Sequence, residues 1–298
     1  MRLGKVRHES KYLAIEYFHT EKNWSIGWMC KHLEVARAAY YKWLHRETPE
    51  DEMENIKLAE LIKEYDERFS HILGYRRMTS WINHFNQTKY SKNRVHRIMK
   101  KLGIHSVIRK KKKKYRNANA DETTQNILQR DFYATAPNQK WATDVTEFNI
   151  RGDKLYLSPV MDLFNGEIIA FQMERRPVFG LVKDMLKEAI ETLNLNEKPM
   201  IHSDQGWQYQ MRFYQKQLAE RGLTQSMSRK GNCLDNAAME SFFGILKSEC
   251  FYGEEFKSVD ELEQKVKEYI HYYNHERIKV KLKGLTPVEY RNQSLEIA

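Results

Sequence analysis

The sequence predicts an α/β fold in which a mixed-sheet domain follows all-α modules with the character of helix-turn-helix motifs. Three observations lead to this class. A chain of 298 residues suffices for about two domains. Apolar residues in the first part recur at helical spacing. From Asp131 onward, β-rich runs separated by the turn pairs Gly152-Asp153 and Asn165-Gly166 are followed by helices and short strands, which is typical of a sheet flanked by helices.

The first 50 residues are expected to form a helical module. A short apolar helix face precedes a break and a second apolar stretch over residues 35–44. The first face consists of Ile26, Met29, Cys30 and Leu33. This spacing predicts two short helices around a tight turn, which makes residues 1–50 a helix-turn-helix-like module.

Residues 51–120 form a second helical module in this interpretation, with helices over 53–69, 76–85 and 91–103. The last helix begins at Ser91, a plausible N-cap, and ends at Gly103, a residue suited to the left-handed conformation after a helix. Its single apolar face consists of Val95, Ile98, Met99 and Leu102. The last two helices resemble a helix-turn-helix.

The positive charge of the chain is concentrated in this second module. The chain holds 50 Lys and Arg against 40 Asp and Glu, a formal net charge of +10. No Asp or Glu lies between Glu67 and Asp121, whereas 16 Lys or Arg do, so the rest of the chain is mildly acidic. A basic helix face in a helix-turn-helix favours DNA as the partner.

The candidate DNA contacts are Arg94, Arg97, Lys100, Lys101, Lys110, Lys111, Lys112, Lys113 and Lys114. Phosphate contacts would dominate their contribution to affinity, and the pattern does not say which bases are read. For the N-terminal module, two interpretations are equally open: it packs against the rest of the protein, or it contacts DNA as well.

Residues 131–255 are expected to form the mixed-sheet domain, and residues 256–298 a C-terminal helical tail. Strands are predicted over 141–148, 155–164, 167–173, 200–204 and 224–228, and helices over 179–193, 209–221, 235–250, 258–275 and from Thr286. Pro159 is unusual inside a central strand, because it cannot donate a ladder hydrogen bond. It implies an edge position, a bulge or an early strand end.

Three carboxylates in this domain are placed to do phosphodiester chemistry. Asp144 is expected in the first strand, Asp204 ends a later strand, and Glu240 lies on a helix with 35 residues between it and Asp204. A site with two metal ions needs hard oxygen ligands, chiefly Asp and Glu, that converge from different elements. Glu147 and Asp162 remain rival ligands.

The spacing of these carboxylates and their surroundings identify a family. The chain resembles the OrfB-type transposase of bacterial insertion sequences of the insertion sequence three family, with a retroviral-integrase-like (DDE) core of the ribonuclease H-like fold. The matching stretches are residues 130–132, 137–146, 161–164, 202–206, 231–243, 247–249, 272–277 and 286–287, with 38–43, 74–77 and 94–97 in the helical modules.

The resemblance implies that Asp144, Asp204 and Glu240 bind Mg²⁺. Two ions are expected, with Mn²⁺ as a substitute. It also implies strand cleavage at the ends of the element, followed by transfer of the freed 3′-hydroxyl to another phosphodiester. Lys247 lies seven residues after Glu240, on the same helix face, and is expected to hold a DNA phosphate.

The resemblance also implies partners. Element ends and target DNA, a second copy of the chain, and an upstream-frame protein with a helix-turn-helix and a leucine zipper, separate or fused, are expected. Two alternatives to a transposase stay open: a structure-specific nuclease of the same fold, and a DNA-binding regulator without catalysis.

Several features exclude other classes. No apolar run approaches the roughly 18 residues of a membrane helix, and the charged N-terminus does not match a secretory signal, so no membrane partner is expected. Cys30, Cys233 and Cys250 lie far apart and match neither a disulfide framework nor a zinc site. We therefore expect a cytoplasmic protein associated with the bacterial nucleoid.

Overall fold

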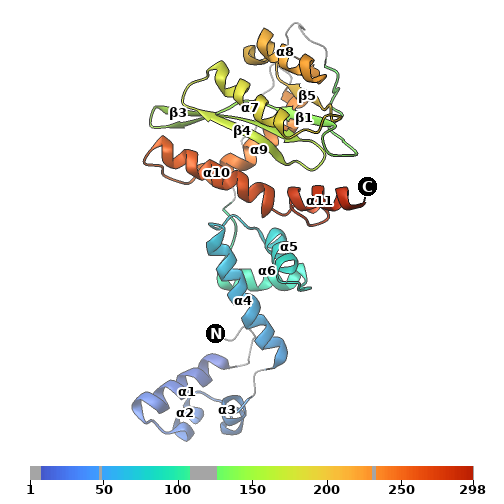
Figure 1. Cartoon of the computed structure of the whole chain (residues 1–298). Helices are drawn as coiled ribbons and strands as arrows, with labels where there is room; N and C mark the ends of the chain where they lie inside the picture. Colours follow the sequence, from blue (N-terminus) through green and yellow to red (C-terminus); the bar gives the residue numbers. More distant parts are fainter. Residues whose placement is uncertain (1–7, 47–48, 108–125, 230–232, 298) are drawn as a thin grey trace. The chain divides into compact units, whose positions relative to one another are not determined.

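The computed structural model describes residues 8–46, 49–107, 126–229 and 233–297. The chain divides into two compact units, residues 1–107 and 108–298. The first unit is helical, and the second contains the sheet (Figure 1). Lys110 to Lys114, which were predicted to contact DNA, lie outside the described residues.

Three helices make up the N-terminal module: α1 (Glu9–Lys22), α2 (Ile26–His32) and α3 (Arg37–Leu44). The two short helices expected on either side of a tight turn are α2 and α3. The longer α1 packs against both of them and completes a small apolar core. That core consists of Tyr12, Ile15, Met29, Cys30, Tyr40 and Trp43.

The second helical module consists of α4 (Glu50–Arg68), α5 (Tyr75–Phe85) and α6 (Lys92–Leu102). The predicted ends of α6 are confirmed. Ser91 Oγ accepts a hydrogen bond from the backbone N–H of Arg94 at 3.2 Å, and Gly103 has the left-handed backbone, φ 72°. Three of the four predicted apolar residues, Val95, Ile98 and Met99, are buried. Arg97, Lys100 and Lys101 of its charged face are exposed.

The second unit contains a mixed sheet with the strand order β2-β3-β1-β5-β6, and β4 pairs with β3. The strands are β1 (Lys140–Thr143), β2 (Thr146–Ile150), β3 (Asp153–Asp162), β4 (Ile168–Glu174), β5 (Met200–Ser203) and β6 (Thr224–Met227). β1 pairs antiparallel with β3 and parallel with β5, and β5 pairs parallel with β6. The prediction of a mixed sheet is confirmed.

The prediction of one strand over 141–148 is wrong, because the structure divides this segment into β1 and β2. Both strands pair with β3 in one register, which places Pro159 opposite Asp144. Proline has no N–H to donate to the carbonyl of Asp144, so the ladder is interrupted there. Pro159 itself lies in a central strand, and neither an edge position nor an early strand end is observed. The pairing of β3 with β4 shifts just after it, between Val160 and Met161, which fits the predicted irregularity.

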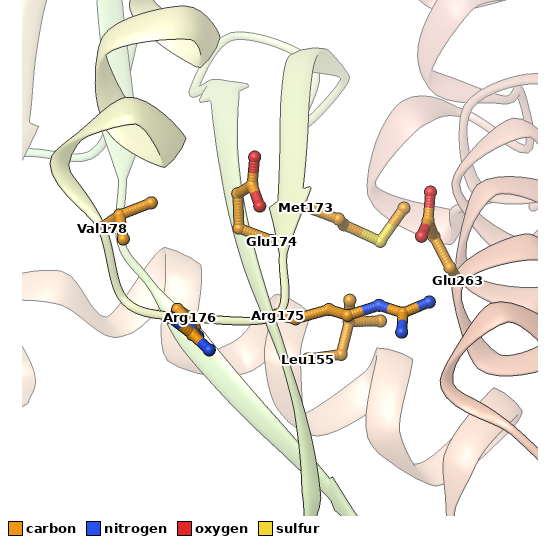
Figure 2. A pocket seen from close by; sticks show the side chains of 7 residues that line it. All are labelled: Leu155, Met173, Glu174, Arg175, Arg176, Val178 and Glu263. Atoms are coloured by element: carbon orange, nitrogen blue, oxygen red, sulfur yellow. The ribbon is translucent and has the colours of Figure 1, made fainter.

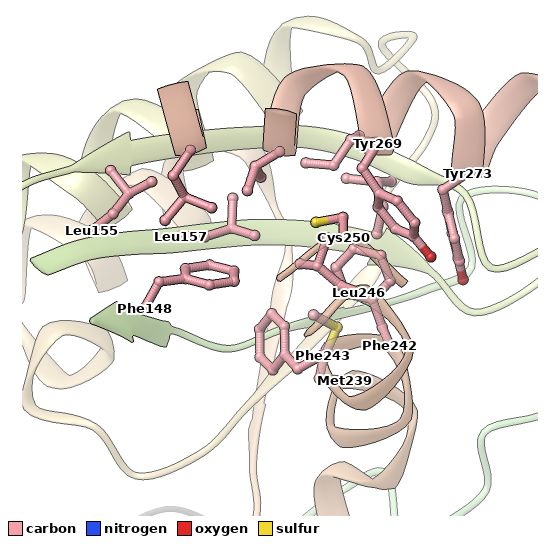
Figure 3. Close-up of a cluster of buried hydrophobic side chains, with 14 of the residues drawn as sticks. Phe148, Leu155, Leu157, Met239, Phe242, Phe243, Leu246, Cys250, Tyr269 and Tyr273 are labelled. Atoms are coloured by element: carbon pink, nitrogen blue, oxygen red, sulfur yellow. The ribbon is translucent and has the colours of Figure 1, made fainter. Parts of the chain in front are cut away.

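Helices cover both faces of the sheet. On one face, α9 (Ala237–Leu246) and α10 (Val259–His275) pack on the strands and enclose an apolar core that includes Phe148, Phe242 and Tyr269 (Figure 3). On the other face, α7 (Phe179–Glu191) and α8 (Arg212–Arg221) enclose a second core around Trp141 and Met185. The segment predicted as a C-terminal tail thus supplies one wall of the first core.

The last described helix, α11 (Pro287–Ile297), begins at a capping box. The hydroxyl of Thr286 accepts the N–H of Glu289 at 3.3 Å, and the carboxylate of Glu289 accepts the N–H of Thr286 at 2.9 Å. Arg291 on this helix forms an ion pair with Asp162, Nη2 to Oδ2 2.6 Å. In the described ranges, no helix is long and apolar enough to cross a membrane.

Candidate active site

Asp144 follows the last residue of β1, at the interruption opposite Pro159. Its side chain is half-buried, and its Oδ1 accepts the N–H of Val145 at 2.8 Å. A backbone N–H therefore holds the carboxylate at the end of a strand whose last three residues are buried.

Asp204 follows β5, the strand that pairs parallel with β1. Because parallel strands end at the same edge of a sheet, the two aspartates emerge side by side from neighbouring strands. Asp204 is half-buried, and its Oδ1 accepts the N–H of Gly206 at 2.9 Å. Burial raises the pKa of its carboxyl group.

Glu240 lies in the first turn of α9 and is half-buried. Asn236, just before this helix, donates a hydrogen bond from Nδ2 to the carbonyl of Thr143 at 3.3 Å. This bond ties the start of α9 to the end of β1, next to Asp144. The glutamate is thereby brought from a distant part of the sequence to the edge where the aspartates lie.

The electrostatics show that the three carboxylates interact. Burial, followed by the negative charges of Asp204 and Glu240, raises the pKa of Asp144 to about 7. As the side chains stand, no group of three or more His, Cys, Asp or Glu in the described ranges could hold a metal ion. The set consists of oxygen donors only, which is the chemistry that Mg²⁺ prefers, and a cation would relieve the repulsion at Asp144.

Two neutral side chains beside these carboxylates support an additional bound group. Among the residues that the structure describes, Nε2 of Gln205 and Oδ1 of Asn236 are buried and have no hydrogen-bond partner. Buried polar atoms are normally satisfied by protein, water or ligand. Gln205 follows Asp204, and Asn236 donates a hydrogen bond to the carbonyl of Thr143, the residue before Asp144, so both residues lie at the same edge of the sheet.

The two rival carboxylates are engaged elsewhere. Glu147 accepts hydrogen bonds from Tyr156 at 2.8 Å and Lys154 at 3.0 Å on the exposed side of β2. Asp162 is fully buried at the end of β3 and is held by Arg291 and by the N–H of Asn138 at 2.9 Å. Both therefore serve to join elements of the fold.

The residue that anchors the helical segment of Glu240 is Asp235, which sequence reasoning used only to mark the start of a helix. It is fully buried in a short helical turn, Cys233–Asn236, directly before α9. Its carboxylate accepts Nε of Arg130 at 2.7 Å, Nε of Arg229 at 3.1 Å and Nδ2 of Asn126 at 2.9 Å. The signal that the sequence offered for Asp235 was its position beside Asn236, directly before an apolar helix.

Lys247 follows α9 directly, and its ammonium group is engaged within the unit. Nζ donates to the carbonyl of Glu147 at 2.7 Å and lies 5.1 Å from the centre of the Phe148 ring. Burial lowers its pKa. Contact with a DNA phosphate would require this lysine to leave the carbonyl, so its predicted role remains a prediction.

The basic residues of α6 fall into two groups. Arg97, Lys100 and Lys101 are exposed. Arg94 points to α4 instead, where its guanidinium donates to Asn55 Oδ1 at 2.8 Å and pairs with Glu54 at 2.9 Å. The structure therefore places the predicted contacts on one helix, but one of them joins two helices of the module.

The second unit also contains a hollow that is separate from the carboxylates. It has a volume of about 350 Å³ and lies where the chain leaves β4, against α10 (Figure 2). Its lining consists of Leu155, Met173, Glu174, Arg175, Arg176, Val178 and Glu263. None of the predicted site residues borders it.

Comparison with family models divides the chain in the same way as its fold. The integrase core domain models match residues 134–233 and 240–295, and the HTH-like domain model matches residues 53–112. The first range contains both aspartates, and the second begins at Glu240.

Comparison with individual proteins gives the same result. The chain is 49% identical over 263 residues to the InsK transposase of insertion sequence element IS150 from Escherichia coli K12, covering 88% of this chain and 91% of that one. It is 33% identical over 290 residues to transposase InsF of IS3A from the same organism, covering 96% and 99%. A simian T-cell lymphotropic virus intasome in complex with PP2A regulatory subunit B56 gamma shares the fold, with TM-score 0.51, 14% identity and coverage of 78% and 72%. The chain therefore belongs to the insertion sequence three family of DDE transposases.

Proposed function

We propose that Asp144, Asp204 and Glu240 are the residues with which this transposase binds divalent cations and cuts and joins DNA. The observation that carries the proposal is the electrostatic coupling of three carboxylates that come from two neighbouring strands and a helix. Two Mg²⁺ ions are proposed, with Mn²⁺ as a substitute. When bound, such ions activate the attacking oxygen and stabilise the leaving oxygen of a phosphodiester.

The protein's own contribution is to hold these carboxylates in place. The backbone N–H groups of Val145 and Gly206, just after β1 and β5, hold the carboxylates of Asp144 and Asp204, and Asn236 holds the start of α9 against the end of β1. Charged groups that are oriented before the substrate arrives need no rearrangement during the reaction. The unpartnered Gln205 and Asn236 atoms are proposed to bond to water or substrate at this edge.

We propose that α6 holds DNA through its exposed basic face, formed by Arg97, Lys100 and Lys101. A hollow of about 440 Å³ lies beside the first turn of α6, lined by Asp51, Asn55, Ser91, Asn93, Arg94 and Arg97. Arg97 borders it from the exposed side and is suited to a phosphate oxygen. Each such contact releases counterions from DNA, which is the main source of affinity.

Element ends and target DNA are the proposed substrates. A homo-oligomer is proposed as the working form, and an upstream-frame partner and association with the nucleoid remain part of the proposal. The two alternatives, a nuclease and a DNA-binding regulator, predict different products from the same DNA, so one experiment separates them.

The test is a strand-transfer assay with Mg²⁺ and duplexes that carry the ends of the element that encodes the chain. Asp144→Asn, Asp204→Asn and Glu240→Gln are each expected to reduce joined product more than about a hundredfold, since even residues that only support metal ligands account for 10- to 100-fold. Glu147→Gln is the matched control, because it removes a nearby carboxylate that is bonded elsewhere.

Each outcome discriminates. Joined product that persists in Asp144→Asn contradicts the proposed ligands. Cleavage without joining by the unmodified protein favours a nuclease, and binding without a metal-dependent product favours a regulator. Direct Mn²⁺ titration, followed by the spin relaxation of water protons, should show weaker binding in the same three variants and unchanged binding in Glu147→Gln.

A further inference from the structure

We propose that the N-terminal module also binds DNA, and that α3 is the helix that contacts the phosphate backbone of the duplex. The inference rests on DNA being the substrate of this chain, as proposed above. It concerns residues 9–46, which precede the matched HTH-like domain at residues 53–112. Of the two interpretations that the sequence left open for this module, it favours contact with DNA.

The connection between α2 and α3 has the length of a helix-turn-helix turn. Four residues, 33–36, separate the two helices, and such motifs use three or four. Lys11 of α1 stabilises this turn, because its Nζ donates a hydrogen bond to the carbonyl of Leu33 at 2.7 Å. Tyr40 and Trp43 hold one side of α3 in the small core. The opposite side of α3 is therefore fixed outward by the fold.

The exposed side of α3 carries positively charged side chains that are suited to bind phosphate. Arg37, Ala38, Lys42 and His45 are exposed. The guanidinium carbon of Arg37 lies 5.6 Å from the centre of the Tyr41 ring, which limits the freedom of the side chain. Ala38 leaves room for a close approach. A partly ordered cation costs less entropy when it binds.

Charge is distributed alike in the two helical modules. In each, the carboxylates of the helices lie on the first one: Glu9, Glu16 and Glu21 on α1, and the acidic residues of α4. No Asp or Glu occurs in α2 or α3, nor in α5 or α6. Since α6 is the proposed DNA helix of its module, the equivalent third helix of the first module offers the complementary charge for DNA.

A second exposed feature of this module suggests a protein partner instead of DNA, and the test must distinguish the two. Trp24 and Trp28 are about half exposed, at 45% and 52%, and their rings contact at 5.8 Å between centres. Such a surface suits a protein partner rather than phosphate. We commit to DNA on α3 because charge complementarity identifies that occupant, whereas nothing identifies a protein on the tryptophans.

The test measures binding of the full chain to an element-end duplex and to an unrelated duplex, as a function of salt. Arg37→Gln with Lys42→Gln is compared with Lys22→Gln with Lys31→Gln, which removes the same charge from α1 and α2. Each lost phosphate contact lowers the slope of log K against log salt by about 0.9. We expect the α3 pair to lower the slope by about 1.8 on both duplexes and the control pair to leave it unchanged.

A slope that is unchanged in the α3 pair, or lowered equally in both pairs, overturns the proposal, because the effect would then be absent or due to net charge alone. An unchanged slope combined with a lower molecular mass of the full chain in solution for Trp28→Ala would assign the module to protein contacts instead. Arg97→Gln with Lys100→Gln is measured in parallel. If the slope is unchanged only in this pair, the proposal for α6 fails and that for α3 stands.

Discussion

Pro159 of β3 lies directly opposite Asp144, and the ladder between β3 and the first two strands is interrupted at this pair. The only residue type without a backbone N–H thus faces a proposed metal ligand. The carbonyl of Asp144 receives no ladder hydrogen bond from β3 at this point, so the backbone can turn the carboxylate toward the edge where Asp204 and Glu240 lie.

We therefore predict that Pro159→Ala impairs catalysis without unfolding the protein. The new N–H can donate to Asp144 and draw β1 and β2 into one strand, which would shift the carboxylate. Strand transfer should fall by at least about tenfold, since a misplacement of 1 Å can cost a hundredfold. The urea unfolding midpoint should stay equal or rise. Full activity in this variant would show that the interruption has no role.

A second prediction concerns the ion pair between Arg277 and Glu249, which joins α10 to the helical segment after α9. Nη2 to Oε1 is 2.8 Å and Nε to Oε2 is 3.0 Å, and the side chains are only 12% and 11% exposed. Arg277→Ala leaves a buried carboxylate without its arginine and should cost about 3–5 kcal/mol in the free energy of unfolding.

The matched control is the pair of Arg175 with Asp260, whose side chains are 61% and 73% exposed. Arg175→Ala should change the free energy of unfolding by less than about 1 kcal/mol. Arg277→Lys should recover part of the loss, because lysine keeps the charge but not the two parallel hydrogen bonds. Equal effects of Arg175→Ala and Arg277→Ala in urea unfolding would contradict this account.

The third prediction is a pH dependence of stability through Asp235. Burial disfavours its charged form, but hydrogen bonds from Arg229 and Arg130 outweigh burial and lower the pKa of Asp235 to about 2. In the unfolded chain the pKa is about 3.9. A lowered folded pKa stabilises the fold above pH 4, and this contribution is lost as the pH falls toward 2.

The measurement is the difference in the free energy of unfolding between the unmodified protein and Asp235→Asn. It should be constant from pH 7 to about 5 and shrink by about 2 kcal/mol between about pH 4 and pH 2. Total stability changes for many reasons in acid, and the difference between the two proteins isolates this carboxylate. A difference independent of pH would mean that folding does not lower the pKa of Asp235.

The fourth prediction separates two arginines of α6. Arg97→Gln should lower the salt slope of DNA binding by about 0.9 and leave stability unchanged, because its side chain is exposed. Arg94→Gln should instead lower the unfolding midpoint, since it breaks the bonds to Asn55 and Glu54 on α4. If Arg94→Gln changes only the slope, Arg94 leaves α4 to bind DNA.

The sequence was sufficient where a local pattern determined the structure. The ends of α6 followed from Ser91 and Gly103, and the start of the last helix from Thr286 and Pro287. The position of Asp204 after a strand was likewise predictable, because the short run from Met200 to Ser203 ends at a loop.

It was insufficient where a distant partner decided the outcome. Periodicity placed Arg94 on the basic face of its helix, but only the fold shows that α4 carries its acceptors, about 40 residues away. The sequence made Asp162 a rival metal ligand and gave Asp235 no role, whereas in the fold both are buried and paired with arginines from distant parts of the chain. The break at Asp144 required knowing which residue of β3 lies opposite it.

The pair of Asp162 and Arg291 has a consequence for synthesis of the chain. The two residues are 129 positions apart, so the carboxylate is made long before the arginine that neutralises it. The helices of the first unit pack through contacts of shorter sequence separation, such as the 39 positions between Asn55 and Arg94, and contacts of shorter separation form earlier and faster. On the ribosome, the modules proposed to hold DNA are therefore expected to be complete while the domain proposed to cut it is still unfinished.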